Sequence, residues 1–301
     1  MMEAKDLNKM RGINFLICPL DSQKFYLENN SIKCKNGHTF DISKEGYVNL
    51  LLSRKKLPGT LGDTKEMLDS RTEFLLSGYY DVLAKEIKNF ASEFIFSRFK
   101  KEIDTKCIIE VGCGTAYFIE NLKKAIESEN ISTFTYLGTD ISKTAVKFAS
   151  KRIKDVTFLV CDTYSSIPIE TGSAALILNV FSPRKIKEFK RLTSKGGGVL
   201  VVIPNEDHLS ELIKPLNLMK IEPEKEDKIK KTFKKENFLL IKEERINYKI
   251  NLDSEMIMNL IKMGPNYWKL KESTIKEVQD IKNKKISVSV KLLLFAKGND
   301  E

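Results

Sequence analysis

Two glycines lie two residues apart at the end of an apolar run, in the segment Ile109-Glu110-Val111-Gly112-Cys113-Gly114-Thr115-Ala116-Tyr117. A parallel strand passes through a tight turn of this kind into a helix. Glycine suits the turn because a Cβ would keep the backbone away from a ligand, and because the turn can require a positive φ. The segment therefore predicts a site for a nucleotide-like cofactor, although dinucleotide-binding enzymes use a closely related loop.

Two aspartates end the next two apolar runs, Asp140 after residues 134–139 and Asp162 after residues 156–161. A carboxylate at the end of a second strand can accept both hydroxyls of a ribose. One at the end of a third strand can accept the exocyclic amine of adenine. Both are candidate cofactor ligands together with Gly112 and Gly114, and the alternative for each acid is a solvated strand end.

The alternation of strand and helix patterns predicts the fold that would position these residues. Further strands are expected over residues 175–181 and 199–203, with a helix over 184–192 and a turn at Gly196-Gly197-Gly198. A helix ending at Arg152 has Ser142 as its N-cap. The pattern predicts an α/β fold with a mostly parallel, doubly wound sheet that carries its ligands at the carboxyl ends of the strands.

The end of the chain adds two strands, over residues 238–250 and 286–297, with a helix over 254–263 between them. Ala116 stands near the place where a dinucleotide loop has its third glycine. With Glu110, the glycine spacing and Asp140, the pattern resembles the class I S-adenosylmethionine-dependent methyltransferases. That resemblance implies a Rossmann-like sheet closed by an antiparallel C-terminal hairpin, with S-adenosylmethionine as cofactor.

Four residues near the N-terminus have the spacing of a metal site: Cys18 and Asp21 in C-x-x-D, then Cys34 and His38 in C-x-x-x-H. Two tight turns that each present two ligands can complete a zinc tetrahedron. The metal then replaces the core that so small a module cannot build. Aspartate is a rare ligand in structural zinc sites, and the alternative is a β-ribbon without metal.

Composition limits the function classes. The chain has 301 residues and a net charge of +10, which suggests a polyanionic partner, and Arg54-Lys55-Lys56 is a short basic segment that suits phosphate contacts. No apolar run approaches the ~20 residues of a membrane span. The N-terminus lacks the apolar run of a signal peptide, and five scattered cysteines indicate a reducing compartment. We therefore expect a cytoplasmic protein that does not enter a membrane.

Blocks along nearly the whole chain resemble the bacterial large-subunit ribosomal RNA guanine-N1 methyltransferases (the RlmA family). They run in order from about residue 15 to about residue 270. The blocks are Cys18 to His38, Phe40 to Leu51, Gly62 to Met67 with Arg71, Phe74 and Gly78-Tyr79-Tyr80, Asn179-Val180-Phe181-Ser182-Pro183, and Met263-Gly264-Pro265-Asn266-Tyr267-Trp268.

The resemblance implies site residues. It places zinc ligands at Cys18, Cys34 and His38, with Asp21 where the family has its remaining cysteine. It implies cofactor contacts that lie in the linker, in the glycine loop and after the fifth strand: Tyr80, Gly114, Thr115 and His208. Asn179 is a candidate catalytic residue that would contact the guanine edge, and Phe181 a ring that would stack on the base; the alternative for both is a packing role at the end of the strand.

The implied reaction is methyl transfer to N1 of a guanine in a 23S ribosomal RNA hairpin, by a homodimer. We expect three regions: a zinc-ribbon-like RNA-recognition module over residues 1–52, a linker and helix over 53–100, and the methyltransferase domain over 101–301. Two alternatives stay open. One is a methyltransferase for a small molecule or protein, and the other an RNA-binding module that has lost its chemistry.

Overall fold

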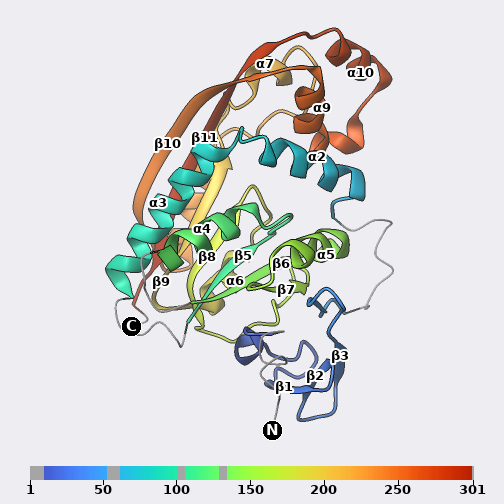
Figure 1. The fold of residues 1–301 in the computed structure, drawn as a ribbon. Helices are drawn as coiled ribbons and strands as arrows, with labels where there is room; N and C mark the ends of the chain where they lie inside the picture. Colours follow the sequence, from blue (N-terminus) through green and yellow to red (C-terminus); the bar gives the residue numbers. More distant parts are fainter. Residues whose placement is uncertain (1–9, 53–61, 100–105, 129–133, 300–301) are drawn as a thin grey trace.

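A large sheet of eight strands forms the centre of the computed structural model, which describes residues 10–52, 62–99, 106–128 and 134–299 (Figure 1). The basic segment at residues 54–56 lies outside the described residues. The five strands from β9 through β8, β5 and β6 to β7 are neighbours in the sheet and parallel to one another, as predicted. The strand order is β10 (Phe238–Leu252), β11 (Lys284–Lys297), β9 (Thr193–Pro204), β8 (Ala174–Val180), β5 (Cys107–Val111), β6 (Thr135–Asp140), β7 (Thr157–Val160) and β4 (Val48–Asn49).

Helices cover both faces of this sheet, which explains why its central strands are apolar without alternation. Neighbouring residues such as Ile108 and Ile109 enter different core clusters on opposite faces. One cluster includes α3 (Asp81–Arg98), α4 (Tyr117–Ser128) and α5 (Lys143–Arg152). The other includes α6 (Ile186–Leu192) and α8 (Lys225–Lys235). The N-cap role predicted for Ser142 is confirmed, because its hydroxyl accepts a hydrogen bond from the Ala145 N–H.

The predicted turn at residues 196–198 is wrong, because these glycines lie inside β9. Their small size is needed there for close packing between strands. A Cβ on Gly197 would lie 2.7 Å from the carbonyl oxygen of Ala174, and one on Gly198 would lie 2.5 Å from that of Phe295. The register between β8 and β9 shifts here: Ala174 pairs with Thr193 and Leu176 with Gly198, so β9 has more residues than β8 between these two pairs.

The C-terminal hairpin of β10 and β11 is antiparallel, as predicted, and carries an insertion between its strands. The insertion holds α9 (Ser254–Lys262), the short helix η3 (Pro265–Lys269) and α10 (Glu272–Gln279). It packs against α2 (Lys65–Leu76), so these elements lie together at one end of the molecule (Figure 1). The hairpin therefore places a small helical layer next to the linker that precedes α3.

The N-terminal residues form a separate three-stranded antiparallel sheet at the other end of the molecule (Figure 1). Its strands are β1 (Phe25–Glu28), β2 (Ser31–Cys34) and β3 (Thr39–Asp41), after the short helix η1 (Ile13–Phe15). Although β4 follows this small sheet directly, it pairs in parallel with β7 of the large sheet. The N-terminal segment thus contributes an edge strand to the methyltransferase-like core.

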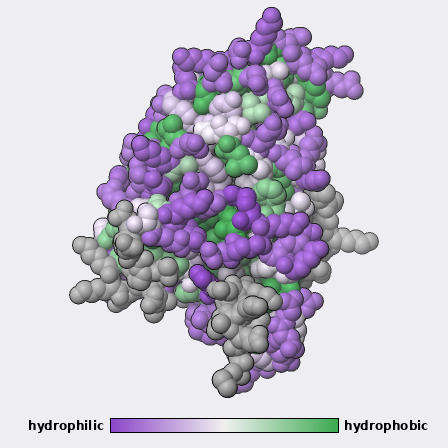
Figure 2. All heavy atoms as spheres, in the orientation of Figure 1, coloured by the Kyte–Doolittle hydropathy of each residue, from purple (hydrophilic) through white to green (hydrophobic). Residues whose placement is uncertain are grey.

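Hydrophilic side chains cover most of the face seen in Figure 2, and hydrophobic groups are scattered among them. Within the described ranges, no helix has both the length and the apolar character that crossing a membrane requires. The short helix α7 (Ser210–Ile213) follows β9 and packs on β11.

Candidate cofactor site and metal cluster

The loop between β5 and α4 has the positive φ angles that the glycine pattern predicts. Gly112 has φ 72° and Gly114 φ 50°, and Ala116 follows with φ 60°. A Cβ on Gly112 would lie 2.5 Å from the Cβ of Ser182, so the loop passes directly beside the turn after β8. The backbone N–H groups of Gly112 and Cys113 both donate to the carbonyl of Thr139. The loop is therefore held at the carboxyl ends of three adjacent strands.

Two carboxyl groups hold this loop in place, Glu110 fully buried and Asp140 half-buried. Asp140 accepts from the N–H of Gly114 (2.9 Å) and from that of Ser142 (2.8 Å), one on each oxygen. Glu110 accepts from the N–H of Ile119 at 3.1 Å, which fixes the start of α4. Burial raises the pKa of both carboxyl groups, that of Glu110 to about 8. The acid predicted to receive a ribose thus also shapes the glycine loop, and its free lone pairs remain for a ligand.

Asp162 lies after β7, at the same edge of the sheet. Its carboxylate accepts from the N–H of Tyr164 (2.9 Å) and from the hydroxyl of Ser165 (3.0 Å), and so stabilises the turn that follows. Thr115 is buried, and its carbonyl accepts from Arg152 at 2.8 Å. Because this carbonyl is already bonded, a backbone contact of Thr115 with the cofactor would involve its N–H.

Asn179 is fully buried at the end of β8, and its side chain holds the turn that follows. Its amide N–H groups donate to the hydroxyl of Ser182 (2.6 Å) and to the carbonyl of Pro183 (2.9 Å). Its oxygen accepts from Nε of Arg184 at 2.9 Å. Both amide hydrogens are used within the protein, so a contact of this amide with a guanine would require the turn to open. The geometry favours a positioning role for Asn179.

The turn that Asn179 holds presents Phe181 to solvent in a strained backbone conformation. Its φ is 51°, a value that a bulky side chain rarely adopts, and 40% of the residue is exposed. Strain of this kind is concentrated at functional sites. The ring lies 6.3 Å from that of Tyr80 and 6.1 Å from that of His208, the latter nearly parallel. Three residues singled out from different parts of the sequence thus meet in one aromatic row.

His208 is held as a neutral imidazole. Its Nδ1 accepts from the backbone N–H of Ser289 in β11 at 3.1 Å, which leaves the proton on Nε2. Burial lowers the pKa of this imidazole to about 4. Tyr80 is buried just before α3, and its ring packs edge-on against Phe74 of α2. His208 can therefore donate a hydrogen bond at its site without carrying a charge.

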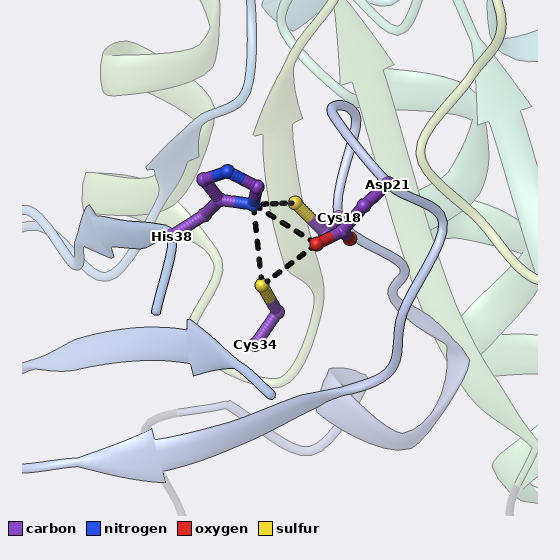
Figure 3. Close-up of side chains that lie close together, drawn as sticks. All are labelled: Cys18, Asp21, Cys34 and His38. Atoms are coloured by element: carbon purple, nitrogen blue, oxygen red, sulfur yellow. Dashed lines mark hydrogen bonds and ion pairs between the residues drawn. The ribbon is translucent and has the colours of Figure 1, made fainter. Parts of the chain in front are cut away.

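The four residues predicted to bind zinc converge in the small sheet (Figure 3). Their ligand atoms all lie within 4.8 Å of one another. Nδ1 of His38 lies 3.4 Å from Sγ of Cys34, 3.5 Å from Sγ of Cys18 and 3.0 Å from a carboxylate oxygen of Asp21. Tetrahedral zinc, with bonds of about 2.0–2.3 Å, separates its ligands by roughly 3.3–3.8 Å. The donor set and its dimensions therefore fit a zinc ion.

The aspartate of this cluster is held ready to act as a ligand. The N–H of Gln23 donates to one oxygen at 3.0 Å, and the amide of Asn36 donates at 2.9 Å to the oxygen that faces the cluster. These hydrogen bonds, led by that from Gln23, keep the pKa of the carboxyl group well below its usual range. Outer hydrogen bonds of this kind orient metal ligands. Asp21 thus supplies an ionised oxygen where the family resemblance places a cysteine.

The small sheet packs at the amino ends of the strands of the large sheet, whereas the glycine loop lies at their carboxyl ends. The N–H of Gly12 donates to Thr157 at the start of β7, and that of Ile17 donates to the carbonyl of Pro168, shortly before β8. The glycine loop and both aspartates lie at the opposite, carboxyl ends of these strands. The metal cluster is therefore a structural element remote from the cofactor loop.

The sequence patterns assigned no role to Asp63 and Arg71. The structure brings Arg71 against the loop, because its Nη1 would be 2.7 Å from a Cβ on Gly114, and Asp63 pairs with this guanidinium. The two residues stand in a block that the family resemblance singled out, but no spacing pattern in the sequence links them to the glycine loop.

A parallel sheet with this loop, and with acids at the ends of β6 and β7, defines an S-adenosylmethionine-dependent methyltransferase. A methyltransferase-domain family model matches residues 108–197, and the N-terminal zinc-ribbon model of RlmA matches residues 16–57. The 23S rRNA (guanine(748)-N(1))-methyltransferase of Streptomyces fradiae is 31% identical over 256 residues, 85% of this chain and 86% of the relative. The chain belongs to the family of 23S rRNA (guanine-N1)-methyltransferases.

Further relatives differ in their level of similarity. One from Micromonospora griseorubida, whose name refers to the same 23S rRNA (guanine-N1) reaction, is 29% identical and covers 84% of this chain and 86% of its own. Among solved structures, the YcgJ protein from Bacillus subtilis has a TM-score of 0.48 and 14% identity. It covers 72% of this chain and 100% of its own.

Proposed function

We propose that this protein transfers the methyl group of S-adenosylmethionine to N1 of a guanine in a hairpin of 23S ribosomal RNA. The single structural observation that supports it most is Phe181, an exposed and strained aromatic ring at the end of the strand beside the glycine loop. A ring so placed can stack on a base that has left its helix. Family membership supplies the reaction and the acceptor class.

When bound, S-adenosylmethionine supplies an electrophilic methyl group on a sulfonium. The residues that would hold it are the glycine loop with Asp140 and Asp162, together with Tyr80 and His208. N1 of neutral guanine carries a proton and is a poor nucleophile until the proton leaves, so the base must be fixed in line and shielded from water. Phe181 would fix the plane of the base, and Asn179 would keep Phe181 in its strained position through Ser182 and Pro183.

The zinc module would contribute to binding RNA. Lys35 and Lys44 are exposed on it, whereas Lys33 pairs with Glu28 at 3.0 Å. Because the module lies at the amino ends of the strands, an RNA that reaches both it and Phe181 would extend along the side of the sheet that ends in β4. Such contacts would fix the register of the hairpin on the protein. A place in the cytoplasm belongs to the same proposal, because the thiols of Cys18 and Cys34 must stay reduced to bind a metal.

A homodimer is part of the same proposal. β10 forms the outer edge of the large sheet and pairs, within the described part of the chain, with β11 alone. Leu239, Leu240 and Ile241 on this strand are all more than a third exposed. An unpaired apolar edge is a surface on which a second chain can add. We expect light scattering to give a molar mass of twice that of the chain, and a monomer mass would contradict it.

Replacing Phe181 with alanine tests the role of the ring. Stacking of a base on an aromatic side chain contributes about 1–3 kcal/mol, so Phe181→Ala should lower the kcat of RNA methylation by about 10- to 100-fold. Binding of S-adenosylmethionine should change little. The assay is methyl incorporation into 23S RNA at saturating substrate, with mass spectrometry to locate the N1-methylguanine.

Two variants make the result specific. Phe181→Tyr keeps the ring and should retain most of the activity. Trp268→Ala removes another exposed aromatic side chain, at the helical insertion, and should leave kcat at saturating RNA unchanged. Equal activity of Phe181→Ala and the unmodified protein would exclude stacking on this ring. Cofactor binding without methylation of RNA would indicate a small-molecule or protein acceptor.

A further inference from the structure

Arg71 reaches the glycine loop from outside the core sheet. It lies on α2, and its Nη1 is the atom nearest to Gly114, 2.7 Å from the position of a Cβ on that residue. The same nitrogen pairs with the carboxylate of Asp63, and Nη2 donates to the carbonyl of Met263 at 2.7 Å. The guanidinium thus joins the loop, the linker and the C-terminal insertion at one point.

The segment that carries this pair is anchored over the end of β6. The hydroxyl of Ser142, two residues after Asp140, donates to the carbonyl of Asp63 at 2.9 Å. A Cβ on Gly62 would lie 2.8 Å from that of Ser142, so the two segments are in close contact. Thr64 then caps α2 by accepting from the Met67 N–H at 3.2 Å. These contacts fix the backbone on both sides of the pair, so the position of Arg71 at the loop does not depend on its side-chain conformation alone.

Arg71 retains capacity for a ligand. A guanidinium has five N–H groups, and two of them are used by Asp63 and Met263 in the described part of the chain. Its side chain is 24% exposed, so it is not sealed off from solvent on the side of the loop. A planar guanidinium matches a carboxylate better than it matches a hydroxyl or an amine. S-adenosylmethionine has a single carboxylate, on its methionine part.

We propose that Arg71 binds the carboxylate of S-adenosylmethionine, and that Asp63 holds the guanidinium in place for this contact. The inference rests on the proposed function, in that it takes the cofactor to be S-adenosylmethionine. It adds α2 and the residues just before it to a cofactor site in which the linker was so far represented by Tyr80 alone. Arg71 is a binding residue for the cofactor and Asp63 a positioning residue.

Another arginine touches the same loop and serves as a comparison. Arg152 of α5 donates to the carbonyl of Thr115 and pairs with Glu120 of α4. Its contacts therefore lie between the loop and the outer helices. A substitution of Arg152 therefore disturbs the loop but leaves the guanidinium of Arg71 beside Gly114.

The test compares two ligands that differ only in the carboxylate: S-adenosylhomocysteine and its decarboxylated analogue, S-adenosyl-3-thiopropylamine. Calorimetry on the full chain gives the dissociation constant of each. A hydrogen-bonded ion pair contributes enough that Arg71→Gln should weaken S-adenosylhomocysteine about 10- to 100-fold. The same variant should weaken the analogue less than about 2-fold, because the analogue has nothing to lose at this position. Arg71→Lys should restore part of the difference.

The comparison variant and the controls separate the outcomes. Arg152→Gln should change the affinity for both ligands by the same factor, and thermal unfolding of every variant confirms that it is folded. If Arg71→Gln weakens both ligands equally, Arg71 only supports the fold and the inference is overturned. If the unmodified protein binds neither ligand, the proposed function itself is wrong.

Discussion

The Gly112→Val variant is expected to lose cofactor binding by at least about 30-fold, because two separate costs of about 1–3 kcal/mol apply at this position. The φ of 72° is strained for a branched residue. In addition, a Cβ would lie 2.5 Å from that of Ser182, whose hydroxyl donates to the carbonyl of Val111 at 2.6 Å. The turn cannot move aside without breaking that bond. Calorimetric titration with S-adenosylmethionine measures the loss.

Gly172→Val is the matched control for this effect. Gly172 also has a positive φ, 68°, but nothing lies within 4 Å of a Cβ placed on it. It lies just before β8, at the amino ends of the strands, whereas the glycine loop lies at their carboxyl ends. The variant should lose stability through backbone strain and keep its affinity for the cofactor. An affinity of Gly112→Val close to that of the unmodified protein would show that the cofactor does not bind at this loop.

The second large effect is expected at the metal cluster, where Cys34→Ser should remove both the metal and the ordered small sheet. Cys34 is fully buried at the end of β2, and its thiol contacts both His38 and Asp21. A module of this size depends on its metal for most of its folding free energy, about 10–16 kcal/mol in zinc-finger peptides. Elemental analysis should fall from about one zinc per chain to near zero. Hydrogen exchange should then become fast over residues 18–41.

Two further variants define the origin of this loss. Cys107→Ser changes another buried cysteine, at the start of β5, that is not one of the four ligands, and it should retain zinc. Asp21→Cys creates a site with three thiolates and should hold zinc more tightly against a chelator. Because the small sheet packs at the amino ends of the strands, cofactor affinity should change little in Cys34→Ser. Full zinc content in Cys34→Ser would show that the four residues do not form the site.

Local patterns were sufficient for the core of the fold. Ser142 was recognised as a helix N-cap, and the strands that end at Asp140 and near Phe181 were placed to within a few residues. Each depends on interactions between neighbours in sequence, such as a hydroxyl that accepts an N–H three residues on. The metal cluster was equally accessible, because the spacing of its four ligands is itself the signal.

Patterns failed where a residue's role depends on what packs against it from elsewhere. Gly196 to Gly198 have the composition of a turn, and only the carbonyls of Ala174 and Phe295 reveal that they lie in a strand. The position of Asn179 left two roles open, contact with the substrate or packing at the end of the strand. Its amide hydrogens are nevertheless taken by the turn that follows, which a strand pattern cannot show.

The sequence by itself therefore determined the class of fold, the glycine loop with its two aspartates, and the four candidate zinc ligands, because all of these follow from short-range spacing and side-chain chemistry. Only the tertiary structure decided that Phe181 meets Tyr80 and His208, that β4 extends the large sheet, and that Arg71 lies against Gly114. These contacts join segments far apart in the chain. They form because burying the surfaces between those segments is favourable, and no local period records which segments will meet.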